Sequence, residues 1–386
     1  MSVRTTLVAA GALALTAALT AALAGPALAA PAQAAPGGGH AATRAAVQAA
    51  VAAGVPGVTA TARDRRGSWS TTAGVGDLRT GAPRSAADHY RVGSITKTFV
   101  ATVLLQLEAE GRLSLDDTVD RWLPGVVTGN GNDGRRITVR QLLNHTSGIF
   151  NYTSDDDFGR TYFLADGFLR HRYDTLTPAA LVAIAMKHEP AFAPGTDWAY
   201  SNTNYVLAGM VIKAVTGHSY AREITDRVIA PLHLTGTSLP GTRTTVPRPS
   251  GRAYSKLAET ATGPTYDVTA LNPSMASSAG EMISTSADLT RFYQALLRGR
   301  LLPAHQLKEM KTTIPVPGNP GSAYGLGLAD RTLSCGVHVW GHDGGIHGSS
   351  SLAATTADGR HALAVNYNGD WTEDPQAVLE AEFCGA

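Results

Sequence analysis

With 44% hydrophobic and 16% charged residues, the 386-residue chain has the composition of a globular protein with a large core, which excludes a largely disordered chain. Thirty-two lysines and arginines nearly balance 31 aspartates and glutamates, and the formal charge of +1 provides no basic surface of the kind that nucleic acids bind. Nucleic acid is therefore not an expected partner.

Residues 1–34 have the layout of a secretory signal peptide. Arg4 precedes an apolar run rich in alanine and leucine, which is followed by a Gly-Pro break and by A-x-A sites that would allow cleavage near residues 29–34. A membrane anchor is the alternative, but the run is short and diluted by alanine and threonine. We expect a secreted, extracellular monomer without stable insertion into a membrane.

The segment after this leader favours a helix and then a β-hairpin. An alanine-rich amphipathic stretch predicts a helix over 41–53. Two alternating segments rich in β-branched residues, 58–63 and 68–73, predict the hairpin. A long helix should begin at Ser94 and end at Gly111, because apolar residues recur there at helical spacing.

The remaining elements divide into a helical middle and a strand-rich end. Helices are expected over 138–144, 178–187, 204–215 and 375–383, and strands over 324–328, 337–340, 349–355 and 361–367. This order predicts an α+β fold in which both chain ends, 40–112 and 276–386, build an antiparallel sheet flanked by helices, and residues 113–275 form a mostly helical inserted domain.

The first candidate for chemistry is the pair Ser94 and Lys97, at the start of the predicted long helix. Residues three apart share one helix face, so the amine could take the proton of the hydroxyl and make it a nucleophile. The helix N-terminus would add N–H donors for an oxyanion. Alone, the pair also fits a helix cap followed by an ordinary surface lysine.

A second motif, Tyr200-Ser201-Asn202, precedes an apolar helical segment. A phenol and an amide in this place could relay a proton and hold a substrate amide. The alternative interpretation is structural, with Ser201 or Asn202 capping the helix and Tyr200 packed over it. Both interpretations stay open on this motif alone.

A third motif, His342-Asp343-Gly344-Gly345, follows the predicted strand at 337–340. Its glycines would let a substrate backbone approach a strand edge, and its histidine could meet a substrate carboxylate. A glycine-rich turn is one alternative. A metal site is another, but it lacks an HExxH or CxxC pattern, and we expect no metal and no cofactor; its ligands would be His338, His342, Asp343 and His347.

Cys335 and Cys384 are the only cysteines of the chain. In an exported protein they would meet an oxidising environment, and a bond between them would contribute roughly 4 kcal/mol on the chain-entropy model. Two unpaired buried thiols are the alternative.

In chain order, the three motifs resemble the signature of the penicillin-interacting serine enzymes. Segments 90–97, 110–117 and 137–149 resemble the class C β-lactamase and D-alanyl-D-alanine carboxypeptidase superfamily. The YSNTNYVLAGMVI, YGLGL, LSCG and FCG stretches resemble its secreted actinobacterial D-alanyl-D-alanine carboxypeptidase/transpeptidase branch. The resemblance implies an active site in a cleft between a sheet domain and a helical domain, and a disulfide from Cys335 to Cys384.

The same resemblance implies roles for individual residues. Ser94 would be the acylated nucleophile, Lys97 its base partner, and Tyr200 the phenol that passes a proton to the leaving group. Asn202 would hold the acyl-side amide, and His342 stands where other members carry lysine. The positions that would complete the substrate site are Gly344, Gly345 with its oxyanion-binding N–H beside that of Ser94, and Phe158 and Thr161 in the pocket wall.

This chain departs from the resemblance at the specificity positions. Ala329 stands where an arginine is expected to bind a carboxylate, and Asp343, Gly345 and His347 replace hydroxyl and amide side chains. A negative charge at Asp343 should weaken the binding of a substrate carboxylate and could instead meet an ammonium group.

These observations give one leading hypothesis and several alternatives. The leading hypothesis is a serine hydrolase that acts on D-Ala-D-Ala-type peptides through an acyl-enzyme and is inhibited covalently by β-lactams. An esterase, a D-amino-acid amidase or aminopeptidase, and a β-lactamase are the enzymatic alternatives acting on small acyl substrates. A catalytically silent module that binds the cell wall is the non-enzymatic one.

Overall fold

A computed structural model describes residues 39–372 and 375–385. The signal peptide predicted for residues 1–34 lies outside these described residues. Within them, no helix is both long and apolar enough to cross a membrane.

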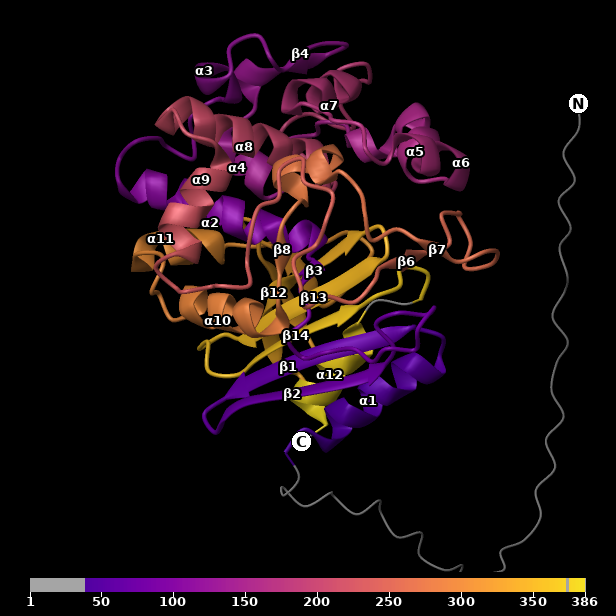
Figure 1. Ribbon diagram of the computed structural model, residues 1–386. Helices are drawn as coiled ribbons and strands as arrows, with labels where there is room; N and C mark the ends of the chain where they lie inside the picture. The colour runs from indigo at the N-terminus through magenta and orange to yellow at the C-terminus, as the bar shows by residue number, and fades with distance from the viewer. Residues whose placement is uncertain (1–38, 373–374, 386) are drawn as a thin grey trace, which may run out of the picture. The chain divides into compact units, whose positions relative to one another are not determined.

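An antiparallel sheet forms the centre of the described fold (Figure 1). Its eight described strands run in the order β2-β1-β14-β13-β12-β11-β10-β9, so the hairpin from the start of the chain pairs directly with its last strand. The strands are β1 Gly57–Asp64, β2 Gly67–Gly74, β9 Ile314–Pro315, β10 Ser322–Tyr324, β11 Ala329–Thr332, β12 His338–Ile346, β13 Ser349–Thr356 and β14 Ala362–Tyr367.

The described part of the chain has twelve α-helices, ten of which lie between β2 and β9 in the sequence. They are α1 Ala41–Ala52, α2 Thr96–Ala109, α3 Val119–Trp122, α4 Val139–Leu143, α5 Asp156–Tyr162, α6 Ala165–His171, α7 Pro178–Ala185, α8 Asn202–Thr216, α9 Tyr220–Ile224, α10 Ser286–Leu297, α11 Ala304–Met310 and α12 Gln376–Cys384. Short two-stranded ribbons join β3 Tyr90–Arg91 with β8 Ile283–Ser284, β4 Thr128–Gly129 with β5 Asn132–Asp133, and β6 Tyr254–Ser255 with β7 Tyr266–Asp267.

The two faces of the sheet bury different helices. On one face, Val47 of α1 and Leu379 of α12 pack against Val58, Leu352 and other strand residues. On the other face, α10 packs directly against β1, β13 and β14, and α8 packs on α2 in the same hydrophobic core (Figure 1). The α+β fold predicted from the sequence, an antiparallel sheet from both chain ends flanked by helices, is thereby confirmed. The inserted-domain boundaries at 113 and 275 stay a prediction.

Two of the predicted elements differ from the structure. The strand predicted over 324–328 is wrong: β10 ends at Tyr324 and a tight turn follows, because Gly327 has a positive φ of 67°. The strand predicted to end at residue 340 continues to Ile346, so the His342 motif lies inside β12 and not in a turn after it.

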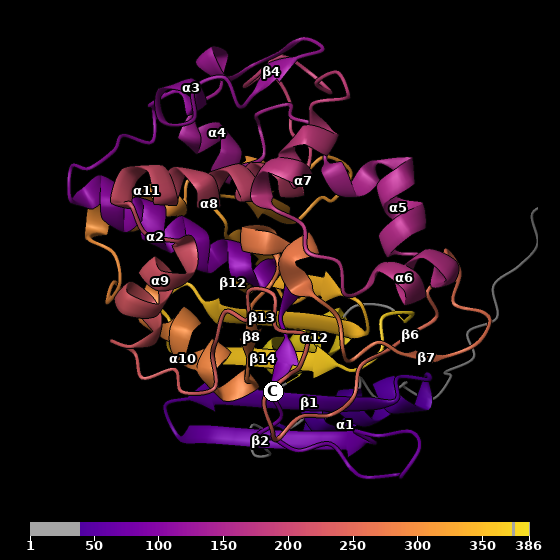
Figure 2. The ribbon, with the colours of Figure 1, turned by 45° about the horizontal axis from the view of Figure 1, so that its top comes forward.

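The hairpin of β6 and β7 lies beside α5 and α6, as both views show (Figures 1 and 2). Ala165 N–H donates to the carbonyl of Leu257 in the hairpin loop, and Phe168 packs with Leu257 and Val268. This loop therefore has a fixed place next to the pocket described below.

Cys335 and Cys384 form a disulfide, as the resemblance implied. It joins the turn between β11 and β12 to the last residue of α12. The bond ties the C-terminal helix to the sheet.

Candidate active site

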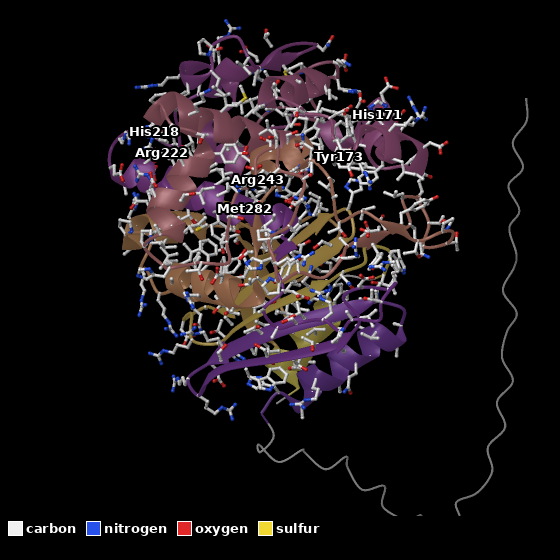
Figure 3. All side chains as sticks on the ribbon, viewed as in Figure 1. His171, Tyr173, His218, Arg222, Arg243 and Met282 are labelled. Carbon is white, nitrogen blue, oxygen red and sulfur yellow. A yellow bond between two sulfur atoms is a disulfide. The ribbon has the colours of Figure 1, made fainter. Side chains whose placement is uncertain are left out.

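Ser94 lies in a 3-10 turn, Gly93–Ile95, that leads directly into α2. The regular helix therefore begins two residues after the predicted start. The turn is held by Met282, labelled in Figure 3, whose carbonyl accepts from Val92 N–H and whose own N–H donates to Thr96 Oγ1. These contacts on both sides of Ser94 fix the direction of its side chain.

Lys97 is completely buried, and its amine nitrogen lies 2.9 Å from Ser94 Oγ. Nζ also donates to Asn202 Oδ1 at 2.7 Å and to the carbonyl of Ala279 at 2.8 Å. Burial lowers the pKa of Lys97 well below its ordinary value, against a smaller opposing effect of Asp343. Since a neutral amine has two N–H groups and one lone pair, the two oxygens use the N–H groups and the lone pair remains for the Ser94 hydroxyl.

Tyr200 immediately precedes the first turn of α8 and is in hydrogen-bond contact with Ser94. Burial raises the pKa of its phenol well above the ordinary value. The phenol is therefore protonated at neutral pH and can act as a proton donor. Lys97 and Tyr200 thus contact the same hydroxyl with opposite proton preferences.

Asn202 is the first residue of α8. Its Oδ1 accepts from Lys97, its Nδ2 donates to Thr153 Oγ1 at 3.2 Å, and its backbone N–H donates to Asn151 Oδ1 at 3.0 Å. Ser201, the N-cap residue, makes no side-chain capping bond. The side chain of Asn202 therefore positions the amine of Lys97.

Strand β12 passes close to Ser94 at Gly344 and Gly345. A Cβ at Gly344 would come within 2.9 Å of the Ser94 backbone nitrogen, and a Cβ at Gly93 within 2.8 Å of the Gly345 nitrogen. A side chain at either position would block this approach. Gly345 itself is exposed and lines the same cavity as Ser94, which leaves an open path to two neighbouring backbone amides.

His342 is buried, and both nitrogens of its ring have partners within the protein. Nδ1 lies 2.5 Å from the carbonyl oxygen of Asp343, so Nδ1 must be the donor, and Nε2 accepts from Tyr324 OH at 2.8 Å. Burial lowers the pKa of His342 to about 4, with Lys97 adding to the effect. His342 therefore carries no positive charge at neutral pH.

Asp343, which the sequence placed beside the site as a free negative charge, is paired. Arg331 donates to its Oδ1 at 2.6 Å. Partial burial acts to raise the pKa of Asp343, but the charge and the hydrogen bond of Arg331 outweigh it and lower the pKa to about 2. Ala329, buried on β11, contributes no charge. The charges at this end of the site therefore cancel locally.

A cavity of about 520 Å³ opens from Ser94. Its wall includes Asn202, Gly345, His347, the 255–261 loop of the β6–β7 hairpin and Trp371. His347 is buried, its Nε2 donates to the Tyr162 carbonyl at 2.7 Å, and burial lowers its pKa to about 4.

Neither of the two predicted wall residues on α5 is among the described residues that line this cavity, and their place in the substrate site stays a prediction. Phe158 is buried in the core, where it packs against Tyr152 and Tyr162, and Thr161 lies on the same short helix. Among the described residues, the lining on this side comes from Tyr152, Thr153 and Phe163.

Arg331 and Tyr324 are two neighbours of the site that the sequence did not reveal. Arg331 comes two residues after Ala329, and residues two apart in a strand share a face. This spacing could have marked Arg331 as a substitute for the missing arginine. Tyr324 begins the YGLGL stretch, and only the pairing of β10 to β12 through β11 brings it to His342.

The Beta-lactamase family matches residues 43–382 of this chain. The chain therefore belongs to the Beta-lactamase family, and it has the fold of its serine hydrolases. The family resemblance seen in the sequence is thereby confirmed. Among curated proteins, Penicillin-binding protein 4* of Bacillus subtilis is 27% identical over 324 residues, which cover 80% of this chain and 67% of that protein.

Two solved structures are similar over nearly the whole described fold. A D-stereospecific amidohydrolase from Streptomyces sp. is 60% identical, with a TM-score of 0.86, covering 90% of this chain and 100% of its own. A D-amino acid amidase from Ochrobactrum anthropi SV3, in complex with L-phenylalanine amide, is 30% identical, with a TM-score of 0.76, covering 88% of this chain and 97% of its own.

Proposed function

We propose that the protein is a serine amidohydrolase that cleaves amides of D-amino acids through an acyl-enzyme on Ser94. One observation carries this proposal: the acyl-transfer groups are assembled around Ser94, but among the described residues the His342 motif and the adjoining strand β11 offer no free cation for a carboxylate. His342 is neutral and its ring nitrogens are occupied, Ala329 carries no charge, and Arg331 is bound to Asp343. An uncharged amide leaving group needs no such cation.

The likeness to two enzymes named for D-amino acid or D-stereospecific amide hydrolysis supports the same substrate class. The penicillin-binding relative supports a second candidate, the D-Ala-D-Ala carboxypeptidase predicted from the sequence. That reaction uses the same acyl-transfer groups. It differs in releasing an amino acid whose carboxylate would lie on the side of Asp343.

In the proposed acylation, Ser94 Oγ attacks the carbonyl carbon while its proton moves to the lone pair of Lys97 Nζ. The backbone N–H groups of Ser94 and Gly345 would hold the oxyanion. When the C–N bond breaks, Tyr200 donates its phenolic proton to the leaving nitrogen. The ammonium of Lys97, which lies 4.9 Å from the centroid of the Tyr200 ring, then returns its proton to the Tyr200 phenolate. Attack of water on the ester releases the acid and regenerates Ser94.

A side-by-side assay tests the substrate class. D-phenylalanine amide, its L-enantiomer, a D-Ala-D-Ala tripeptide, a short-chain ester and a β-lactam would be compared by kcat/KM. The proposal expects the D-amide to be the best substrate and the tripeptide to be poor. A higher kcat/KM for the tripeptide would favour the carboxypeptidase, and turnover of none of them would favour a silent binding module.

Intact-mass measurement after exposure to penicillin tests the nucleophile. The wild-type protein should gain the mass of one β-lactam, and Ser94→Ala should not. An adduct that persists in Ser94→Ala would overturn the role of Ser94.

Secretion is part of the proposal. It rests on the predicted signal peptide and is supported by the Cys335–Cys384 disulfide, a bond that persists in oxidising compartments. Activity in the culture medium, with the mature N-terminus near residues 30–35 as determined by sequencing, is the expected result.

A further inference from the structure

His145 lies directly after the C-cap of α4, within the LLNHTSGI stretch whose role the proposed mechanism leaves open. It has a left-handed backbone conformation, with φ of 63°, and is completely buried. Left-handed conformations are uncommon outside glycine and asparagine. Here this conformation turns the imidazole away from the helix and into a group of tyrosines.

Two hydrogen bonds connect His145 to the residues on either side of Tyr200. The carbonyl of His145 accepts from Ala199 N–H at 3.1 Å, and its ring Nδ1 accepts from Ser201 N–H at 3.2 Å. The imidazole itself lies against the phenol ring of Tyr200, with 4.3 Å between ring centroids. One residue therefore fixes both flanking peptide units and one side of the ring.

The protonation state of His145 follows from its donors. Nδ1 receives two N–H groups, from Ser201 and from Asn204 Nδ2 at 3.3 Å, so it carries no proton. The ring proton is then on Nε2, which is buried and has no hydrogen-bond partner among the described residues. A cationic ring would need a proton on Nδ1 and would lose both bonds. Burial, together with the charges of Lys97 and His342, lowers the pKa of His145 well below its ordinary value.

We infer that His145 is a positioning residue, which holds Tyr200 so that its hydroxyl reaches both Ser94 and the leaving group. The inference rests on the proposed function, because it needs Tyr200 to be the proton donor. A donor must lie within about 2.6 to 3.2 Å of the atom that it protonates. A displacement of roughly 1 Å can cost on the order of 100-fold in rate.

Three variants distinguish the role of the hydrogen-bond acceptor of His145 from the role of the packing of its ring. His145→Asn keeps an oxygen acceptor near the position of Nδ1 and tolerates the left-handed backbone. His145→Leu fills the space of the ring without an acceptor, and His145→Gly relieves the backbone without filling the space. For the Leu and Gly variants we expect kcat with a D-amino acid amide to fall roughly 10- to 100-fold, while KM changes less than about threefold. His145→Asn should stay within about fivefold of wild type.

The decisive measurement repeats these substitutions in a Tyr200→Phe background. If His145 acts through Tyr200, His145→Leu should cost less than about twofold there, because the group that it positions is already absent. Thermal unfolding of each variant reports the purely structural effect. An undiminished loss in the Tyr200→Phe background, or an equal loss in His145→Asn and His145→Leu, would overturn the inference.

The outcomes for the two proposals are distinguishable. Full activity of Ser94→Ala or of Tyr200→Phe overturns the proposed mechanism itself. Loss of activity in Tyr200→Phe together with a fully active His145→Leu overturns only the positioning role of His145.

Discussion

The guanidinium of Arg331 on β11 donates a 2.6 Å hydrogen bond to the carboxylate of Asp343 on β12. Asp343 is half-exposed and Arg331 is mostly buried, so the pair lies at the boundary between protein and solvent. Because the two charges pair with each other, neither is free to bind a charged group of a substrate. This pair, more than any catalytic group, distinguishes the site from one that is built to bind a carboxylate.

Replacing Asp343 with asparagine should shift the substrate preference toward peptides that release a carboxylate-bearing amino acid. The substitution removes the negative charge and frees the Arg331 cation at the leaving-group side. Because the pair is partly solvated, we expect roughly 1 kcal/mol, or about a fivefold rise in the ratio of kcat/KM for a D-Ala-D-Ala tripeptide to that for a D-amide. The measurement is this ratio at low ionic strength.

Asp330→Asn serves as the matched control for this prediction. Asp330 is a carboxylate on β11, the strand that carries Arg331, but it pairs with His338 at 3.1 Å and not with Arg331. The ratio should not change in this variant. An equal change in both variants would point to the net charge of the protein and not to the Asp343 position.

The burial of Lys97 predicts the pH dependence of acylation. The reaction needs the neutral amine, whose fraction rises with pH, and burial places the pKa well below its ordinary value. The acidic limb of the kcat/KM profile should therefore lie far below pH 10. Lys97→Arg keeps a donor but cannot release its proton, and we expect kcat/KM to fall by roughly 10²- to 10⁴-fold.

Lys213 is an exposed lysine on α8, and Lys213→Arg is the control for Lys97→Arg. It should leave the pH profile of kcat/KM unchanged. An acidic limb near pH 10, or substantial activity in Lys97→Arg, would show that another group takes the proton of Ser94.

The parts of the fold that could be predicted are those in which a local pattern matches the final environment. Alternating, β-branched segments over 58–63 and 68–73 predicted β1 and β2, and the alternation matches the exposure of β2. The strand-like segments 349–355 and 361–367 predicted β13 and β14, which are almost entirely buried. The strand predicted over the YGLGL stretch was wrong because the apolar residues of this stretch lie in a turn. A positive φ at Gly327 is a property of the backbone that apolar spacing does not reveal.

The candidate site could be predicted only in part, for a similar reason. Ser94 and Lys97 are neighbours on one turn, so their contact follows from spacing. Other contacts of the site join residues that lie far from this turn in the sequence. The carbonyl of Ala279 accepts a hydrogen bond from Lys97, and Arg331 donates one to Asp343. Those contacts depend on strand register and on the packing of separate elements, which a single sequence does not specify.

His342 predicts a loss of stability in acid. Its pKa is about 4 in the folded protein, against an ordinary value of 6.5, so the unfolded chain binds the proton first as the pH falls. The stabilising contribution is complete above pH 6.5 and is lost as the pH falls through about 4, with a total of up to about 3 kcal/mol. Urea unfolding of His342→Gln should show a flatter dependence on pH than wild type over this range.

Burial also lowers the pKa of His347, and this residue is unchanged in the His342→Gln variant. The pH dependence of stability should therefore be reduced in this variant and not abolished. His305→Gln, a substitution of an exposed histidine, should leave the curve as in wild type. Parallel curves for wild type and His342→Gln would contradict the buried, neutral state of His342.

The Cys335–Cys384 disulfide should contribute stability without contributing to the chemistry. It closes a loop of 49 residues, and on the chain-entropy model its loss would lower the free energy of unfolding by about 4 kcal/mol. The helix that it holds, α12, also places the buried Glu382 in hydrogen bonds with Thr43 at 2.5 Å and His361 at 2.6 Å. These contacts keep α12 docked in the native state, so we expect the Cys335→Ser/Cys384→Ser double variant to fold, with its melting temperature lowered and kcat at 25 °C within about twofold of wild type.

The wild-type protein treated with a reductant is the matched control for the double variant, because it has the same sequence and lacks only the bond. Both samples should lose a similar amount of stability. A fall in kcat that is larger than the unfolded fraction explains would show that the disulfide also shapes the active site, since β12 begins three residues after Cys335 and carries His342 and Gly345. Unchanged unfolding in both samples would mean that the docking of α12, through Glu382 and its buried apolar side chains, already restricts the loop without the bond.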